Sequence, residues 1–168
     1  MTEPTQIKAH TIRSIWRNPI HFLAFGFGSG VLPKMPGTWG TLAAIPIYML
    51  LMNLPLWVYG VLTLAIIVFA IIACGITERD IGIHDYSGIV LDEIAGYLVT
   101  MFAAPLGWFW IIAGFILFRI FDIWKPFPIR WLDRHVSGGF GTVIDDLLAG
   151  IYAWIVLQFM AWAYFYYD

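Results

Sequence analysis

Charged residues and cysteine are both scarce in this 168-residue sequence. Only 12% of its residues are charged, against about 25% in soluble domains. The formal net charge is −2, so the chain lacks the basic excess that marks a nucleic-acid-binding protein. The single cysteine, Cys74, excludes an internal disulfide, and its apolar neighbours predict a small buried core residue. Because apolar residues reach 61%, the composition predicts a protein embedded in a lipid bilayer.

Three long stretches without any charged residue predict an all-α membrane protein. They cover residues 41–77, 94–118 and 147–167. About 20 apolar residues cross a bilayer, and the first two stretches are interrupted by proline-containing breaks at 53–55 and 105–107. We therefore predict one membrane-embedded domain over residues 1–168, a polytopic bundle of about five helices. The predicted helices span about 38–52, 56–76, 92–104, 108–124 and 144–166, the first and third being short, with a further interfacial segment near 18–27.

The distribution of lysine and arginine predicts how this bundle is oriented. If five consecutive helices cross the membrane in alternating directions, the two uncharged breaks fall on one side of it. The N-terminal segment and the connections at 77–93 and 125–142 fall on the other, with every Lys and Arg other than Arg119. The positive-inside rule makes the charged side cytoplasmic. We expect the active site on that side and the C-terminus, Asp168, on the opposite one.

Two pairs of adjacent acids stand beside apolar runs, in segments that resemble each other. Residues 88–96 and 141–150 both have a glycine, three further residues, an acidic pair and a final Ala-Gly. We predict that both pairs, Asp92-Glu93 and Asp145-Asp146, lie in the first turn of a helix. One interpretation is that they cap the free N–H groups there. The other is that they bind a hard cation, most plausibly Mg²⁺, because paired carboxylates near hydrocarbon repel each other.

Three charged residues of the segment FRIFDIWKPFPIR, namely Arg119, Asp122 and Lys125, recur at a spacing of three. On a helix they share one face. They could form a self-contained ladder of ion pairs near the end of the helix. Alternatively, Asp122 faces a metal ion while Arg119 and Lys125 bind an anionic group. The sequence leaves both interpretations open.

Two connecting segments carry further polar residues. GFGSGVLPKMPGTWGTL is rich in glycine and hydroxyl groups and leads into a helix near Thr38, where backbone N–H groups favour a phosphate. It lacks the ending of a P-loop, so ordinary turn formation explains it about as well.

In the second segment, RDIGIHDYSG, His84 stands between Asp80 and Asp85. This histidine is either structural or able to orient a water molecule or protonate a leaving alkoxide.

Four segments in this order resemble the motif set of the phosphatidylglycerophosphatase A family: LPKMPGTWGTL, HDYSGIVLDEIAGY, FRIFDIWKPFPIRW and GGFGTVIDDLLAG. The resemblance covers about residues 18–150. It implies an integral, Mg²⁺-dependent phosphatase at the cytoplasmic face of the bacterial inner membrane. Such an enzyme hydrolyses phosphatidylglycerophosphate to phosphatidylglycerol and phosphate, the step before cardiolipin synthesis. Lys34 is variable in the family pattern, so we do not assign it to the site.

The matched motifs supply the predicted site residues, to which we assign roles by chemistry. We expect catalytic roles for Asp80, His84 and Asp85, metal binding by Asp92, Glu93, Asp122, Asp145 and Asp146, and phosphate binding by Thr38, Arg119 and Lys125. The expected partners are an anionic phospholipid substrate and the membrane, with no nucleic acid.

The alternative function from another class is a transporter or channel that uses the carboxylates as an ion path. Against it, the acids gather on one side and no charge continues a route across the bilayer. A CDP-alcohol phosphotransferase is disfavoured because its spaced aspartate signature is missing.

Overall fold

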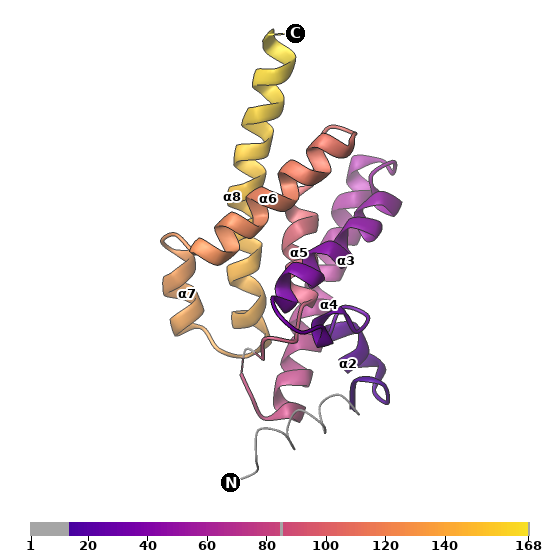
Figure 1. The fold of residues 1–168 in the computed structure, drawn as a ribbon, viewed down its shortest axis with the longest axis vertical. Helices are drawn as coiled ribbons and strands as arrows, with labels where there is room; N and C mark the ends of the chain where they lie inside the picture. The colour runs from indigo at the N-terminus through magenta and orange to yellow at the C-terminus, as the bar shows by residue number, and fades with distance from the viewer. Residues whose placement is uncertain (1–13, 85, 168) are drawn as a thin grey trace.

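The computed structural model describes residues 14–84 and 86–167, and within them every regular element is helical (Figure 1). The prediction of an all-α chain is confirmed. The elements in order are α2 (Pro19–Ala24), the 3₁₀ turn η1 (Ser29–Val31), α3 (Pro36–Leu51), α4 (Leu56–Ile81), α5 (Leu91–Thr100), α6 (Trp108–Trp124), α7 (Ile129–His135) and α8 (Gly138–Tyr167). The expected residue Asp85 lies outside the described residues.

The predicted number of helices is wrong. Seven α-helices occur in the described part of the chain, where about five were expected. α7 was not expected, and α2 falls within the short segment expected near 18–27. α8 begins at Gly138 rather than near 144, so the Asp145-Asp146 pair does not lie in its first turn. The pair Asp92-Glu93 does lie in the first turn of α5, as predicted.

Proline and glycine set the helix boundaries that the sequence predicted well. Pro55 is the N-cap residue of α4 and has an extended backbone, as a proline at a helix start favours. Gly107 is the N-cap residue of α6, with φ of 130°, a conformation that glycine adopts readily. The observed starts at Leu56 and Trp108 therefore agree with the predicted 56 and 108.

The short helix α5 lies at the centre of the bundle. It packs against α3, α4, α6 and α8, and α6 crosses α8 in front of it (Figure 1). Eight of its ten residues are buried. At about 1.5 Å per residue a helix of this length spans roughly 15 Å, half the thickness of a hydrocarbon core. At its N-terminus Asp92 is buried and Glu93 is half-buried.

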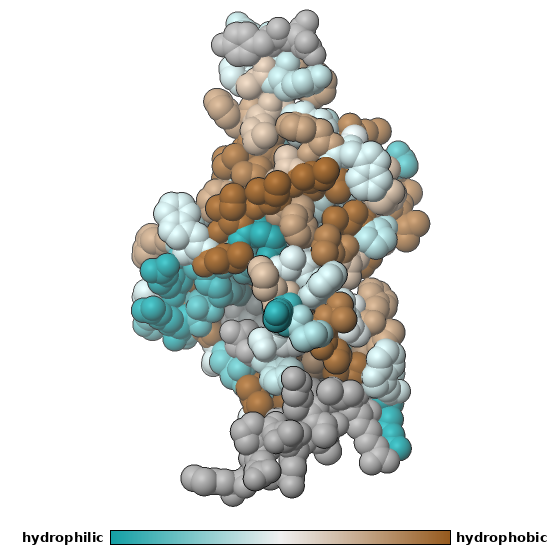
Figure 2. Space-filling view, viewed as in Figure 1, coloured by the Kyte–Doolittle hydropathy of each residue, from teal (hydrophilic) through white to brown (hydrophobic). Residues whose placement is uncertain are grey.

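The outer surface of the helices is strongly apolar. Leu50 is 79% exposed, Trp57 74% and Ile123 65%. Figure 2 shows apolar side chains over α6 and the neighbouring helices, and hydrophilic ones gathered over α7. Among the described residues two helices, α4 and α8, are long and apolar enough to cross a membrane by length and composition.

Candidate active site

Close helix packing brings the two resembling acidic segments face to face. A Cβ atom on Gly150 of α8 would lie 2.4 Å from the carbonyl oxygen of Gly96 in α5. A Cβ atom on Gly96 would in turn lie 2.6 Å from the carbonyl oxygen of Asp146. Only glycine allows two backbones this close, so the final glycine of each segment fixes how the acids meet.

Asp92, Glu93 and Asp146 form the carboxylate cluster of the candidate site. One oxygen from each lies within 4.8 Å of the other two. Oxygens on opposite sides of one hard cation are roughly 4–5 Å apart, given metal–oxygen distances of about 2.0–2.6 Å. The three side chains can therefore share a single cation.

The chemistry of these groups favours a cation as well. Asp92 and Asp146 are buried, and carboxylates placed this close together repel each other unless a cation lies between them. Oε2 of Glu93 is buried and accepts no hydrogen bond from the described residues. Buried acceptors are normally satisfied, and an all-oxygen donor set suits a hard divalent ion.

The capping interpretation fails for the pair Asp145-Asp146 and is incomplete for Asp92. α8 has no acid in its first turn, so Asp146 cannot cap its free N–H groups. Asp92 accepts a hydrogen bond from the backbone N–H of Glu93 at 3.0 Å, and α5 has no side-chain cap at its N-cap residue, Val90. Helix capping therefore does not account for the cluster.

Arg119 and Asp122 of α6 border the cluster. They form an ion pair one turn apart, as the ladder predicted, but Lys125 does not continue the ladder because it pairs with acids of other helices. The Asp122 carboxylate is close enough to act electrostatically on both Glu93 and Asp146. Nε of Arg119 is buried and has no hydrogen-bond partner among the described residues. Arg119 also acts electrostatically on Glu93, so the spare buried donor and the spare buried acceptor belong to neighbouring side chains.

The first turn of α3 covers this pair of groups. A Cβ atom on Gly37 would lie 2.2 Å from Oε1 of Glu93 and 2.9 Å from Nη1 of Arg119. The glycine thus lets the backbone of the GTWG segment touch both side chains. Thr38, the predicted phosphate ligand, is the next residue and is half-buried.

Lys125 connects the cluster to α7. Its Nζ donates to Oδ2 of Asp145 at 2.5 Å and to Oδ1 of Asp133 at 2.8 Å. Burial alone lowers the pKa of this lysine, but the two carboxylates outweigh it and raise the pKa overall. Asp145, predicted to bind metal, is thus paired with Lys125, whereas its neighbour Asp146 belongs to the cluster.

The remaining predicted residues pair with groups outside the cluster. Asp80 Oδ2 lies 2.9 Å from Nε2 of His21, and His84 Nδ1 lies 3.1 Å from Oε2 of Glu78. Glu78 itself is buried in α4 and accepts a hydrogen bond from Thr142. Sequence reasoning missed Glu78, although an acid directly after the uncharged run 41–77 was a usable signal.

Comparison with known proteins gives matches over most of the chain. The family model described as phosphatidylglycerophosphatase A matches residues 22–161. A relative from Escherichia coli (strain K12), named phosphatidylglycerophosphatase A, is 47% identical over 144 residues, which cover 85% of this chain and 84% of the relative. A relative of the same name from Haemophilus influenzae (strain Rd KW20) is 44% identical over 159 residues, covering 94% and 95%. No solved structure matches this chain.

Proposed function

We propose that this chain, which belongs to the phosphatidylglycerophosphatase A family, hydrolyses phosphatidylglycerophosphate to phosphatidylglycerol and inorganic phosphate. The family is one of phosphatases that act on a phosphate monoester, so the chain is a phosphoric monoester hydrolase. The names of the two relatives supply the substrate. They do not favour the alternative of a transporter or channel.

One observation carries the proposal for the site. The buried acceptor Oε2 of Glu93 and the buried donor Nε of Arg119 both lack a partner among the described residues, and both side chains lie beneath Gly37. An anionic phosphate satisfies the arginine, and a cation satisfies the glutamate. A phosphate monoester bound together with a divalent cation supplies both charges at once.

Mg²⁺ is the cation that we propose, held by Asp92, Glu93 and Asp146 with Asp122 close by. When bound, it neutralises the acids, polarises the phosphoryl group and lowers the pKa of a bound water. In the hydrolysis a water oxygen bonds to phosphorus, the bond from phosphorus to the glycerol oxygen breaks, and that oxygen takes a proton. Arg119 and the backbone at Thr38 orient the phosphoryl group. We assign no chemical step to Asp80 or His84, because other side chains already pair with them.

The proposed location is the cytoplasmic face of the bacterial inner membrane, in phospholipid biosynthesis. The apolar surface and the two long apolar helices support a bilayer as the surrounding medium. Arg79 in the last turn of α4, and Lys125, Arg130 and Arg134 between α6 and α8, support the cytoplasmic assignment of the charged side. A lipid headgroup lies at the membrane surface, where the N-terminus of α5 can reach it.

The direct test is phosphate release from phosphatidylglycerophosphate by the full-length protein in detergent micelles. We expect release with Mg²⁺, none after chelation with EDTA, and recovery when Mg²⁺ is restored. Undiminished release in EDTA would contradict the metal assignment. Absence of release from this lipid under all metal conditions would contradict the proposed activity.

A further inference from the structure

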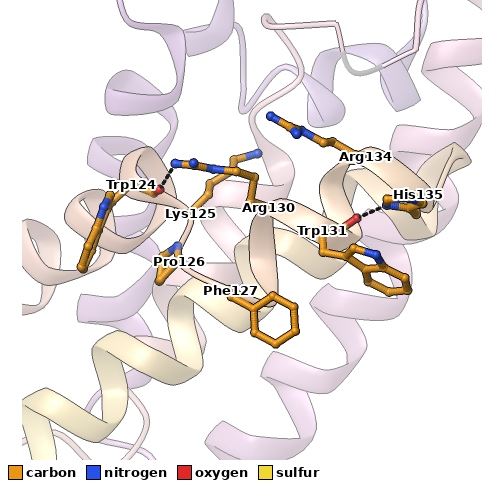
Figure 3. Close-up of a pocket in the computed structure, with 8 residues that line it drawn as sticks. All are labelled: Trp124, Lys125, Pro126, Phe127, Arg130, Trp131, Arg134 and His135. Atoms are coloured by element: carbon orange, nitrogen blue, oxygen red, sulfur yellow. Dashed lines mark hydrogen bonds between the residues drawn. The ribbon is translucent and has the colours of Figure 1, made fainter.

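A basic and aromatic pocket lies beside the carboxylate cluster and has no role in the site described so far. It is formed where α6 ends and α7 begins, and its volume is about 440 Å³. Lys125, Arg130 and Arg134 supply its cations, and Trp124, Phe127 and Trp131 supply its aromatic surface (Figure 3). No acid lines it among the described residues. Its size falls within the usual range of small-molecule sites.

The two arginines of this pocket keep their charge available. Neither Arg130 nor Arg134 forms an ion pair within residues 14–84 and 86–167. Arg130 donates from Nη2 to the carbonyl oxygen of Trp124 at 2.9 Å, which holds its side chain across the pocket (Figure 3). A guanidinium has five donors, so most of them remain for a ligand. Planar guanidinium groups match the oxygens of a phosphate.

Lys125 connects this pocket to the carboxylate cluster. It lines the pocket, and its Nζ reaches Asp145, the residue next to Asp146 of the cluster. Lys125 thus links the pocket to the residue that directly precedes Asp146 of the cluster. A ligand with two phosphate groups joined by a short linker can occupy both at once.

The aromatic residues place the pocket at the depth of lipid headgroups. Trp124 is 63% exposed, Phe127 81% and Trp131 52%. Tryptophan favours the boundary between hydrocarbon and water. The positive charges beside these rings then lie at the level of the phosphodiester groups of the lipids.

We propose that this pocket binds the phosphodiester group of the lipid substrate while the cluster binds its terminal monoester. This inference rests on the proposed function. Phosphatidylglycerophosphate carries both groups, joined by one glycerol unit, and only the monoester is hydrolysed. Arg130 and Arg134 thereby select lipids that carry a second phosphate over simple lipid monoesters.

The test compares two lipid substrates in mixed micelles, using Arg130→Gln, Arg134→Gln and the double variant. Phosphatidylglycerophosphate has the phosphodiester, and phosphatidic acid has a monoester but no phosphodiester. We expect kcat/KM for the first lipid to fall about tenfold or more per arginine, through KM, because each loses a charge-assisted contact. Hydrolysis of phosphatidic acid should stay unchanged. Arg79→Gln is the matched control, because Arg79 is exposed on α4 and lies outside the pocket.

A binding measurement separates this proposal from the proposed function and needs no turnover. Phosphatidylglycerol retains the phosphodiester but has no monoester, so its binding should change the fluorescence of the pocket tryptophans, Trp124 and Trp131, in the wild type and less so in the double variant. Inorganic phosphate should bind both proteins equally. Three results would each overturn the proposal. The arginine variants could lose kcat/KM equally on both lipid substrates, or Arg79→Gln could lose as much as they do. The double variant could also be impaired in binding inorganic phosphate rather than phosphatidylglycerol. A wild type that releases no phosphate but still binds phosphatidylglycerol through these arginines would contradict only the proposed reaction.

Discussion

Gly150 lies directly against Gly96, so that a Cβ atom on Gly150 would lie 2.4 Å from the carbonyl oxygen of Gly96. This contact joins α5 to α8 one turn beyond the acids on each helix. It determines whether Asp92 and Glu93 can share a ligand with Asp146. The geometry of the candidate site therefore depends on two residues that have no side chain.

Replacing Gly150 with alanine should separate the two helices. Forcing a methyl group into a backbone contact costs roughly 1–3 kcal/mol, so we expect a lower thermal midpoint in detergent together with reduced phosphate release. Gly60→Ala is the control, because the nearest atom to a Cβ there is Cε2 of Phe102 at 3.4 Å. If Gly150→Ala were as stable and active as Gly60→Ala, the close contact would not be needed.

Lys125 should contribute more to stability than Lys34. Lys125→Met leaves the buried carboxylate of Asp145 without its cation, and removing one partner of a partly buried pair should cost roughly 1–3 kcal/mol. Lys34→Met removes an exposed side chain that forms no ion pair with the described residues. Thermal unfolding measures both effects. The double variant Lys125→Met/Asp145→Asn should regain most of the lost stability, and no recovery would argue against the pair as the cause.

The two ends of the chain should lie on opposite sides of the membrane. Reporter fusions after Arg134 and after Asp168 test this directly. We expect a cytoplasmic signal from the first, because α7 belongs to the charged side, and a periplasmic signal from the second. A cytoplasmic signal from Asp168 would show that one helix treated as a span does not cross.

The sequence predicted those features that depend on local breaks and residue chemistry. Pro55 and Gly107 fixed the starts of α4 and α6, and three of the four residues in the acidic pairs, Asp92, Glu93 and Asp146, lie together in the fold. It did not predict the start of α8 at Gly138, because glycines disfavour helix by propensity. Gly139 is helical because its backbone packs on α4, where a Cβ would lie 2.5 Å from the backbone nitrogen of Gly75.

The partners of individual charged residues depended on contacts between distant segments. Asp80 pairs with His21, which lies 59 positions earlier in the chain. Nothing in the loop around His84 indicated that Glu78 would bind it. Spacing along one helix did predict the Arg119–Asp122 pair, because neighbours three positions apart share a face whatever the tertiary fold.

The central claim is that Asp92 and Asp146 hold Mg²⁺, and the asparagine variants of these two residues test it most directly. Asparagine has the size of aspartate and keeps one of its acceptor oxygens, so a purely structural role predicts that both variants stay active. Metal binding requires the charge, so we expect each variant to lose phosphate release by on the order of 10²-fold or more at low Mg²⁺. Both should remain folded, and raised Mg²⁺ should partly restore the better of the two. Near-normal turnover of both Asp92→Asn and Asp146→Asn at low Mg²⁺ would contradict the account.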